Sequence, residues 1–246
     1  MSANPVRPNC ARPHSCSFDV RLDAMARSPL TRELKPEEHL DLDSFVTSWA
    51  WSEGDPLMLA GQKVSGSYLV VAGRVRVVRD TIDGREITVD IASPGDIIGP
   101  LETNPSYAVD SAWAMETTCA LYLPADRLAE VIARHPALAV AIVQMQHTRL
   151  AQARDRDVNQ SAKTVVQRVA TVLLRLDAKL GDLRPDGNSL LQVRLRRDDI
   201  AGMAGTTLES TSRAMSQMKK DGLIDSGREW VSIIDAQALE RIVDGE

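Results

Sequence analysis

Apolar and polar residues alternate with a period of two along much of residues 57–123, which is the spacing of half-buried β-strands. Glycines recur through this stretch, and Asp83-Gly84 is a strong signal for a hairpin turn. Many short strands at close, regular spacing predict an antiparallel sandwich or roll. The strand-like segments span residues 68–71, 75–78, 87–91 and 119–123.

A helical pattern follows Pro124, and from about Ala137 to Gln160 the chain contains neither Gly nor Pro. This predicts one helix roughly 35 Å long at about 1.5 Å per residue. A stripe along it has the three- and four-residue spacing of a coiled-coil seam. Because a helix this long between two small domains has more surface than either covers, we expect it to hold a homodimer; packing on its own domain is the alternative. The stripe consists of Val140, Val143, His147, Leu150 and Arg154.

The N-terminal residues 1–30 are rich in Pro, Arg and Ser, and they predict a poorly structured arm. A short helix is then expected to open near Leu34, because Pro36 fits the first turn of a helix.

Residues 196–228 predict two short helices around Gly205, followed by a hairpin with a turn at Ser226-Gly227. This is the pattern of a winged helix-turn-helix. Thr206 or Thr207 can cap the second helix. The small apolar face of the first helix consists of Ile200, Ala201 and Ala204, and the buried side of the second consists of Leu208, Thr211, Met215 and Met218.

The opposite face of the second helix carries Glu209, Ser212 and Arg213. Arginine can fork onto guanine, glutamate can accept from cytosine, and serine can serve either base, so this face can read a major groove. The alternative for Glu209 is a capping box with Thr206, in which the carboxylate only reaches back to a backbone N–H.

Composition limits the partners and the location of the protein. The 246 residues are 43% hydrophobic and 26% charged, which is ordinary for a soluble globular protein of two domains. No apolar run is long enough to cross a bilayer and no secretory signal is evident, so we expect a cytoplasmic protein without a membrane partner. No nucleophile–base pair or phosphate loop supports an enzyme.

The net charge of −5 gives no support for nucleic-acid binding, and residues 161–246 hold 13 Lys and Arg against 13 Asp and Glu. Phosphate contacts must therefore be local. The candidates for them, beside Thr207 at the helix start, are Arg194, Arg196, Arg197, Arg213, Lys219 and Lys220.

The order of roll, long helix and winged helix-turn-helix resembles the Crp/Fnr family of bacterial transcription regulators over about residues 34–246. Residues 208–213 are most similar to the Fnr branch, whose Glu-x-x-Ser-Arg triad reads TTGAT-like half-sites. The resemblance implies a homodimer that binds a palindromic DNA site and contacts RNA polymerase. Other segments that carry it are residues 71–77, 83–87, 94–99 and 167–174.

The predicted fold class is α+β, with a β-roll like that of cyclic-nucleotide-binding proteins, a long central dimerisation helix and a C-terminal winged helix-turn-helix. The expected boundaries are a cysteine-bearing arm over residues 1–30, the roll over 31–135, the dimerisation helix over 136–160 and the DNA-binding domain over 161–246.

Cyclic-nucleotide binding is disfavoured at the positions where family members hold the sugar and phosphate. There the sequence has Gly99-Pro100 and Asp110-Ser111, and a carboxylate at Asp110 would repel a phosphate. Arg74 or Arg85 could still serve another anion.

Three cysteines are too few for a disulfide framework and favour redox or metal chemistry. Residues 114–119 resemble the segment that carries the internal cluster-ligating cysteine of Fnr-type oxygen sensors, and the family keeps its other cysteines in the arm. The resemblance therefore implies an iron–sulfur cluster on Cys10, Cys16 and Cys119, with a fourth ligand among His14, Asp19 and Asp23.

Two alternatives stand beside the cluster. Cys119 can be a small buried core residue, with Cys10 and Cys16 as incidental exposed thiols. Haem is weaker, because His39, His135 and His147 are more typical of surface or helix positions than of axial ligands.

The sequence therefore predicts a non-enzymatic, DNA-binding transcription regulator that senses oxygen, nitric oxide or redox state through an iron–sulfur cluster. The alternatives are a regulator of the same type with another effector or none, and a regulatory subunit that uses a cyclic-nucleotide-type roll.

Overall fold

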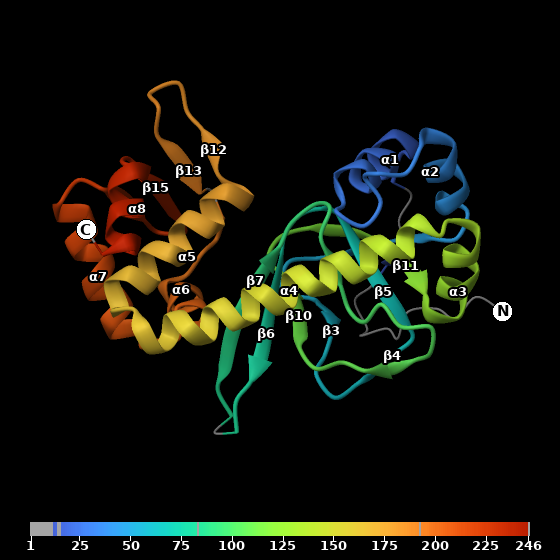
Figure 1. Cartoon of the computed structure of the whole chain (residues 1–246), viewed down its shortest axis with the longest axis horizontal. Helices are drawn as coiled ribbons and strands as arrows, with labels where there is room; N and C mark the ends of the chain where they lie inside the picture. Colours follow the sequence, from blue (N-terminus) through green and yellow to red (C-terminus); the bar gives the residue numbers. More distant parts are fainter. Residues whose placement is uncertain (1–11, 14–15, 83, 192, 246) are drawn as a thin grey trace. The chain divides into compact units, whose positions relative to one another are not determined.

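A computed structural model describes residues 12–13, 16–82, 84–191 and 193–245 (Figure 1). The described chain divides into two compact units. The first contains the residues up to Glu86 together with Asp90–Ala151, and the second contains Ile87–Val89 and Gln152–Glu246. No single helix in the described ranges is long and apolar enough to span a bilayer; only α3 (Ala125–Arg134) and α4 (Ala137–Ala162) taken together, which meet at a bend of 118°, reach that length and hydropathy.

The first unit holds two antiparallel sheets, as the two-residue periodicity predicts. The larger has the order β1 (Arg12–Pro13), β2 (Thr47–Trp51), β11 (Thr118–Pro124), β5 (Gly66–Ala72), β8 (Ile97–Ile98). The second has the order β3 (Pro56–Met58), β10 (Ser111–Ala114), β6 (Val75–Asp80), β7 (Glu86–Ala92). A short ladder joins β4 (Lys63–Val64) to β9 (Ser106–Tyr107). The four predicted strands lie within β5, β6, β7 and β11, and Gly84 has the positive φ expected in the turn after β6.

The larger sheet is buried on both faces, and the alternation along β11 separates two hydrophobic clusters. Ala120 and Tyr122 belong to a cluster between the two sheets, which we call the roll core. Cys119 and Leu121 belong to a cluster against the helices, which we call the helix-side core. Because successive side chains of a strand point to opposite faces, one strand supplies both cores.

The helices α1 (Phe18–Arg27), α2 (Pro36–Asp43) and α3 (Ala125–Arg134) belong to this unit, and α4 (Ala137–Ala162) begins in it and continues past its end at Ala151. Pro36 is the first residue of α2, as predicted. The prediction of an unstructured arm is wrong for residues 18–27, which form α1. The reason is tertiary, because Ala24 and Met25 are buried in the helix-side core and stabilise a segment whose own helical pattern is weak.

The second unit is a winged helix-turn-helix with an added hairpin. Its helices are α5 (Val165–Leu180), α6 (Arg197–Met203), α7 (Leu208–Lys220) and α8 (Ala236–Asp244). Its sheet has the order β12 (Asp182–Leu183), β13 (Ser189–Leu191), β15 (Trp230–Ile233), β14 (Ile224–Gly227). The predicted apolar face of α6 is buried, and Gly205 makes the turn with a φ of 59°.

Two local predictions in this unit are wrong. Leu208 is half exposed, because it is the first residue of α7 and lies before the turns that pack inward, whereas Thr211, Met215 and Met218 are buried as expected. The wing turn is not at Ser226-Gly227, which lie in β14; it falls two residues later, at Arg228-Glu229, because Gly227 pairs with Trp230 across the hairpin.

Candidate DNA-binding surface and sensor core

The start of α7 is capped by Thr207. Its side-chain oxygen accepts the backbone N–H of Ser210 at 3.2 Å, and its hydroxyl donates to the Ser210 hydroxyl. With Thr207 as the cap, the third helical residue is Ser210, so the proposed capping box between Thr206 and Glu209 does not form. Glu209 therefore does not act as a capping-box carboxylate, which was the alternative to base recognition.

The outward face of α7 presents complementary charges. Glu209 and Arg213 lie one turn apart, with 3.4 Å between a carboxylate oxygen and a guanidinium nitrogen, and both side chains are more than 70% exposed. Ser212 lies beside them and is half-buried. An exposed ion pair of this kind contributes little to stability. Glu209 and Arg213 can therefore give up their ion pair and bind base edges at a small cost in free energy.

The side chains predicted to contact phosphates differ in whether they already have partners within the protein. Lys219 lies 2.5 Å from a carboxylate oxygen of Asp225 and donates to the carbonyl oxygen of Ser226. The Lys219 ammonium, followed by the Ser226 N–H, holds the pKa of Asp225 below its usual value. Lys219 therefore clamps α7 to β14, while Lys220 and Arg197 are exposed.

The sequence prediction missed Arg228, which is exposed at the tip of the wing. It is followed by Glu229, which turns the chain with a φ of 66°. Gly227 precedes it because a Cβ there would lie 2.3 Å from the indole nitrogen of Trp230. The sequence signal that could have located the wing tip, and with it Arg228, is the pair of Gly227 and Trp230. A glycine within a strand marks the close approach of another group, here a large ring at the end of the ladder.

The seam of α4 is open to solvent in the single chain. Val140, Val143 and Leu150 are each more than half exposed, and Leu138 is the one buried residue among those described in this helix. His147 and Arg154 are also exposed. Three large aliphatic side chains in one stripe form an apolar surface that packing within this chain does not cover.

In the helix-side core, the structure brings together two cysteines that are more than a hundred positions apart. Cys16 and Cys119 are both free, each is 7% exposed, and both belong to the helix-side core. Burial raises the pKa of the Cys119 thiol far above its ordinary value, and the contact with Cys16 raises it further. The alternative of Cys16 as an exposed, incidental thiol is therefore wrong.

The remaining predicted cluster ligands are not gathered at this thiol pair. Cys10 and His14 lie outside the described residues. Asp19 is exposed, and Asp23 is exposed and ion-paired with Arg27 at 2.6 Å. Among the residues that the structure describes, no group of three Cys, His, Asp or Glu side chains could hold a metal ion.

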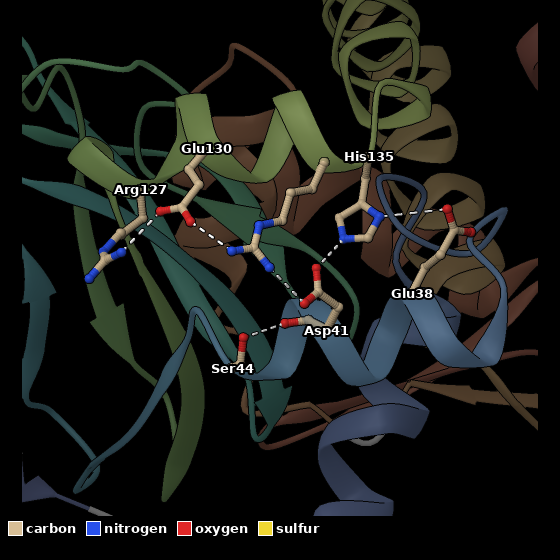
Figure 2. Close-up of polar contacts among 7 residues, drawn as sticks. Glu38, Asp41, Ser44, Arg127, Glu130 and His135 are labelled. Atoms are coloured by element: carbon tan, nitrogen blue, oxygen red, sulfur yellow. Dashed lines mark hydrogen bonds and ion pairs between the residues drawn. The ribbon is translucent and has the colours of Figure 1, made fainter.

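The predicted haem candidates have protein partners or face solvent. His39 is buried, and its Nε2 donates to the carbonyl oxygen of Thr31 at 2.8 Å. His135 is buried between two carboxylates, with Nε2 2.9 Å from Asp41 and Nδ1 3.6 Å from Glu38 (Figure 2). These contacts hold the rings in structural roles.

In the roll, Asp110 is tied to an arginine. The Arg79 Nε donates to its carboxylate at 2.8 Å, and Arg74 is similarly paired with Glu116 at 3.0 Å. An arginine paired with a carboxylate offers less attraction to a ligand phosphate than an uncommitted one.

The chain matches two family models, a Crp-like helix-turn-helix domain at residues 167–242 and a cyclic nucleotide-binding domain at residues 49–135. It is 31% identical to the cyclic AMP receptor protein of Thermus thermophilus, over 90% of this chain and 99% of the relative. It is 25% identical to the transcriptional activator FnrA of Stutzerimonas stutzeri, over 88% of each chain.

Among solved structures, FixK2 from Bradyrhizobium japonicum superposes with a TM-score of 0.71 at 27% identity, over 80% of this chain and 96% of the other. These relatives are transcription regulators and not enzymes, in agreement with the expectation from the sequence. The two domains, their order and this likeness over nearly the full length establish that the chain is a DNA-binding regulator and belongs to the Crp/Fnr family.

Proposed function

We propose that the protein is a cytoplasmic homodimer that reads a palindromic DNA site with α7 and senses oxygen, nitric oxide or redox state through its cysteines. The observation that carries the proposal is the buried pair of Cys16 and Cys119, which lies in the same hydrophobic cluster as Leu138 at the start of α4. The signal and the dimer helix therefore share one core.

Base recognition is assigned to the exposed face of α7. Arg213 forks onto a guanine, Glu209 accepts from a cytosine, and Ser212 serves either base. Lys220, Arg197 and, from the wing, Arg228 are suited to phosphates, which position the protein without carrying sequence information.

The role of Lys219 is tested by substitution. Lys219→Ala is expected to weaken binding to specific and random duplexes by the same factor, because it loosens the wing and removes one cation. Lys220→Ala, which leaves the wing clamp intact, is the matched control. A change of base preference in Lys219→Ala would contradict the assignment.

The exposed seam on α4 supports the proposed dimer. A second copy would cover Val140, Val143 and Leu150, whose apolar surface is open in one chain. Two recognition helices must then match successive major grooves about 34 Å apart. Small changes in helix packing alter this spacing, so they change affinity for the whole site. RNA polymerase is the expected partner at the promoter.

The proposed sensor is an iron–sulfur cluster on Cys10, Cys16 and Cys119, with a fourth ligand among His14, Asp19 and Asp23. The described residues fit it in part: two sulfur donors are buried in one hydrophobic cluster, Asp19 and Asp23 are exposed, and Cys10 and His14 fall outside the described ranges. When bound, such a cluster supplies a group that dioxygen and nitric oxide attack.

The cysteines would act on the helix by packing. Cys16 directly precedes α1, whose Met25 is buried in the helix-side core with Cys119 and Leu138. Loss or modification of the cluster bound by the cysteines would reposition α1 against this core. Because close-packed cores change by discrete repacking, the first turns of α4 respond.

The test is an ultraviolet–visible spectrum with iron and sulfide analysis on protein purified without oxygen. A coloured protein that loses colour in Cys119→Ser supports the cluster. Ala120→Ser is the control, because it places the same hydroxyl on the adjacent, oppositely facing position of β11. Singly substituting His14, Asp19 and Asp23 identifies the fourth ligand.

A second candidate is a regulator of the same type with another effector or none, in which the cysteines only pack the core. The observation that favours it is the raised pKa of Cys119, which keeps the thiol neutral in an apolar cluster. Colourless, iron-free anaerobic protein with DNA affinity indifferent to Cys119→Ser would select this candidate.

A further inference from the structure

The helix-side core contains an apolar cavity of about 40 Å³. Helices α1, α2, α3 and α4 and the outer face of the larger sheet all contribute to its wall. The lining residues that matter here are Met25, Leu42, Leu121, Val131, Leu138 and Ile142. The first five of these belong to the same cluster as Cys16 and Cys119, Ile142 packs against it, and Leu138 and Ile142 come from the first turns of α4.

The cavity is unsuited to water. The lining is almost wholly apolar, and two of its three hydroxyl groups are engaged within the protein: Thr31 donates to the carbonyl oxygen of Met25, and Ser28 accepts the backbone N–H of Leu30, which leaves only the Ser67 hydroxyl. A buried water needs two to four polar partners, and cavities lined by aliphatic side chains stay dry and bind apolar guests such as xenon.

The size of the cavity sets the class of guest. A water-sized sphere needs about 10–15 Å³ measured in this way, so 40 Å³ admits roughly three such spheres. That is room for a diatomic molecule or one xenon atom and too little for a ring. A nucleotide, a haem or an acyl chain does not fit.

Polar contacts link α2 to the C-terminal end of α3, two of the helices that line the cavity (Figure 2). Asp41 of α2 accepts from Arg134 at 3.1 Å and contacts His135 at 2.9 Å, and Arg134 also bonds Glu130. Each of these helices also contributes to the cavity wall, α2 through Leu42 and α3 through Val131. The network therefore links α2 to the end of α3 beside the cavity.

We propose that this cavity is a binding site for a small apolar molecule of the size of a dissolved diatomic gas, and that its occupant packs directly against Leu138 and Ile142 of α4. The proposal is separate from the iron–sulfur cluster, since it needs no metal and no cysteine. Occupancy fills missing contacts at the base of the dimer helix, so a guest stabilises this packing.

The test uses xenon as the probe on the full-length protein with labelled methyl groups. Raising the xenon pressure is expected to shift the methyl resonances of Leu138, Ile142 and Val131 in a saturable way. The methyl groups of Val70 and Val75 in the roll core are expected to stay unshifted. Xenon is also expected to raise the unfolding temperature.

Val131→Ile fills the cavity with one added methyl group and keeps a β-branched residue in α3, so it should abolish both effects. Val70→Ile is the matched control, because both valines are fully buried and Val70 lies outside the cavity. Val46→Ile, at a partly exposed position in the wall, provides a second filling variant if Val131→Ile folds poorly.

A second arm replaces xenon with dioxygen, whose unpaired electrons broaden nearby methyl resonances. Broadening confined to the same methyl groups supports a gas-sized site. No shift with xenon, shifts that persist in the filling variants, or broadening spread evenly over both cores would each overturn the proposal.

Discussion

Glu209→Ala tests whether the outward face of α7 reads bases. In the folded protein Glu209 makes one exposed ion pair with Arg213, and it lies in the first turn of the helix. The pair is worth about 0.3–0.5 kcal/mol. The favourable field at a helix N-terminus adds roughly as much again. We therefore expect the free energy of unfolding to fall by about 0.5–1 kcal/mol.

The effect on recognition is expected to be larger and of a different kind. A good base contact contributes about 1–3 kcal/mol of discrimination, or roughly 5- to 150-fold between the preferred base and its alternatives. Glu209→Ala should lose this preference at one base pair of each half-site. Selection from randomised duplexes gives the preference, and fluorescence anisotropy with single-base variants gives its size.

Thr207→Ala is a control of nearly equal stability. It removes the helix cap, which costs about 1 kcal/mol, and leaves the outward face intact. It should weaken binding to all duplexes without changing the preferred base. Unchanged base preference in Glu209→Ala, with a stability loss like that of Thr207→Ala, would refute base reading by this carboxylate.

Three further predictions concern recognition, assembly and acid stability. Arg213→Ala should weaken specific binding by about 1–3 kcal/mol and relax one base pair; equal loss on random duplexes contradicts this. Leu150→Glu should place two carboxylates across the seam and favour monomers in sedimentation, where an intact dimer counts against the seam. The backbone N–H of Lys35, and then His135, hold the pKa of Glu38 below its ordinary value of 4.5. A pKa that is lowered in the folded state adds stability above pH 4.5, and this stability is lost on acidification. Glu38→Gln should therefore be less stable than wild type near neutrality, and the difference should vanish in acid. A constant difference in the free energy of urea unfolding from pH 7 to 3 would refute this prediction.

Local patterns were sufficient where the side-chain spacing matches the period of a strand or a helix. The alternation in β5 and β11 and the spacing of Met215 and Met218 in α7 follow directly from the side-chain periods of strands and helices. The turn at Gly205 could also be predicted from the sequence, because a turn with positive φ favours glycine.

Tertiary packing explains what the sequence did not reveal. Helix α1 has only ten residues, and its stability depends on Met25 reaching a core made by distant strands. The contact between Cys16 and Cys119 depends on the return of the N-terminal segment to the sheet, where Arg12 and Cys119 both pair with Ala50. No spacing rule in one sequence encodes such a contact.

The wing turn shows a third kind of failure. Ser226-Gly227 has the composition of a turn, yet Gly227 is needed because Trp230 lies over it, and the positive φ falls on Glu229. Glycine in a strand marks close approach as well as reversal, and only the cross-strand partner separates the two.

The central claim, that the cysteine pair controls DNA binding through the helix-side core, is tested most directly by one affinity measurement. The dissociation constant for the selected palindromic site is measured on anaerobic protein and again after the same sample is exposed to air, for wild type and Cys119→Ser. The account predicts tighter binding before exposure in the wild type and no difference in the variant. Equal affinity before and after exposure in the wild type, or an unchanged response in Cys119→Ser, would contradict it.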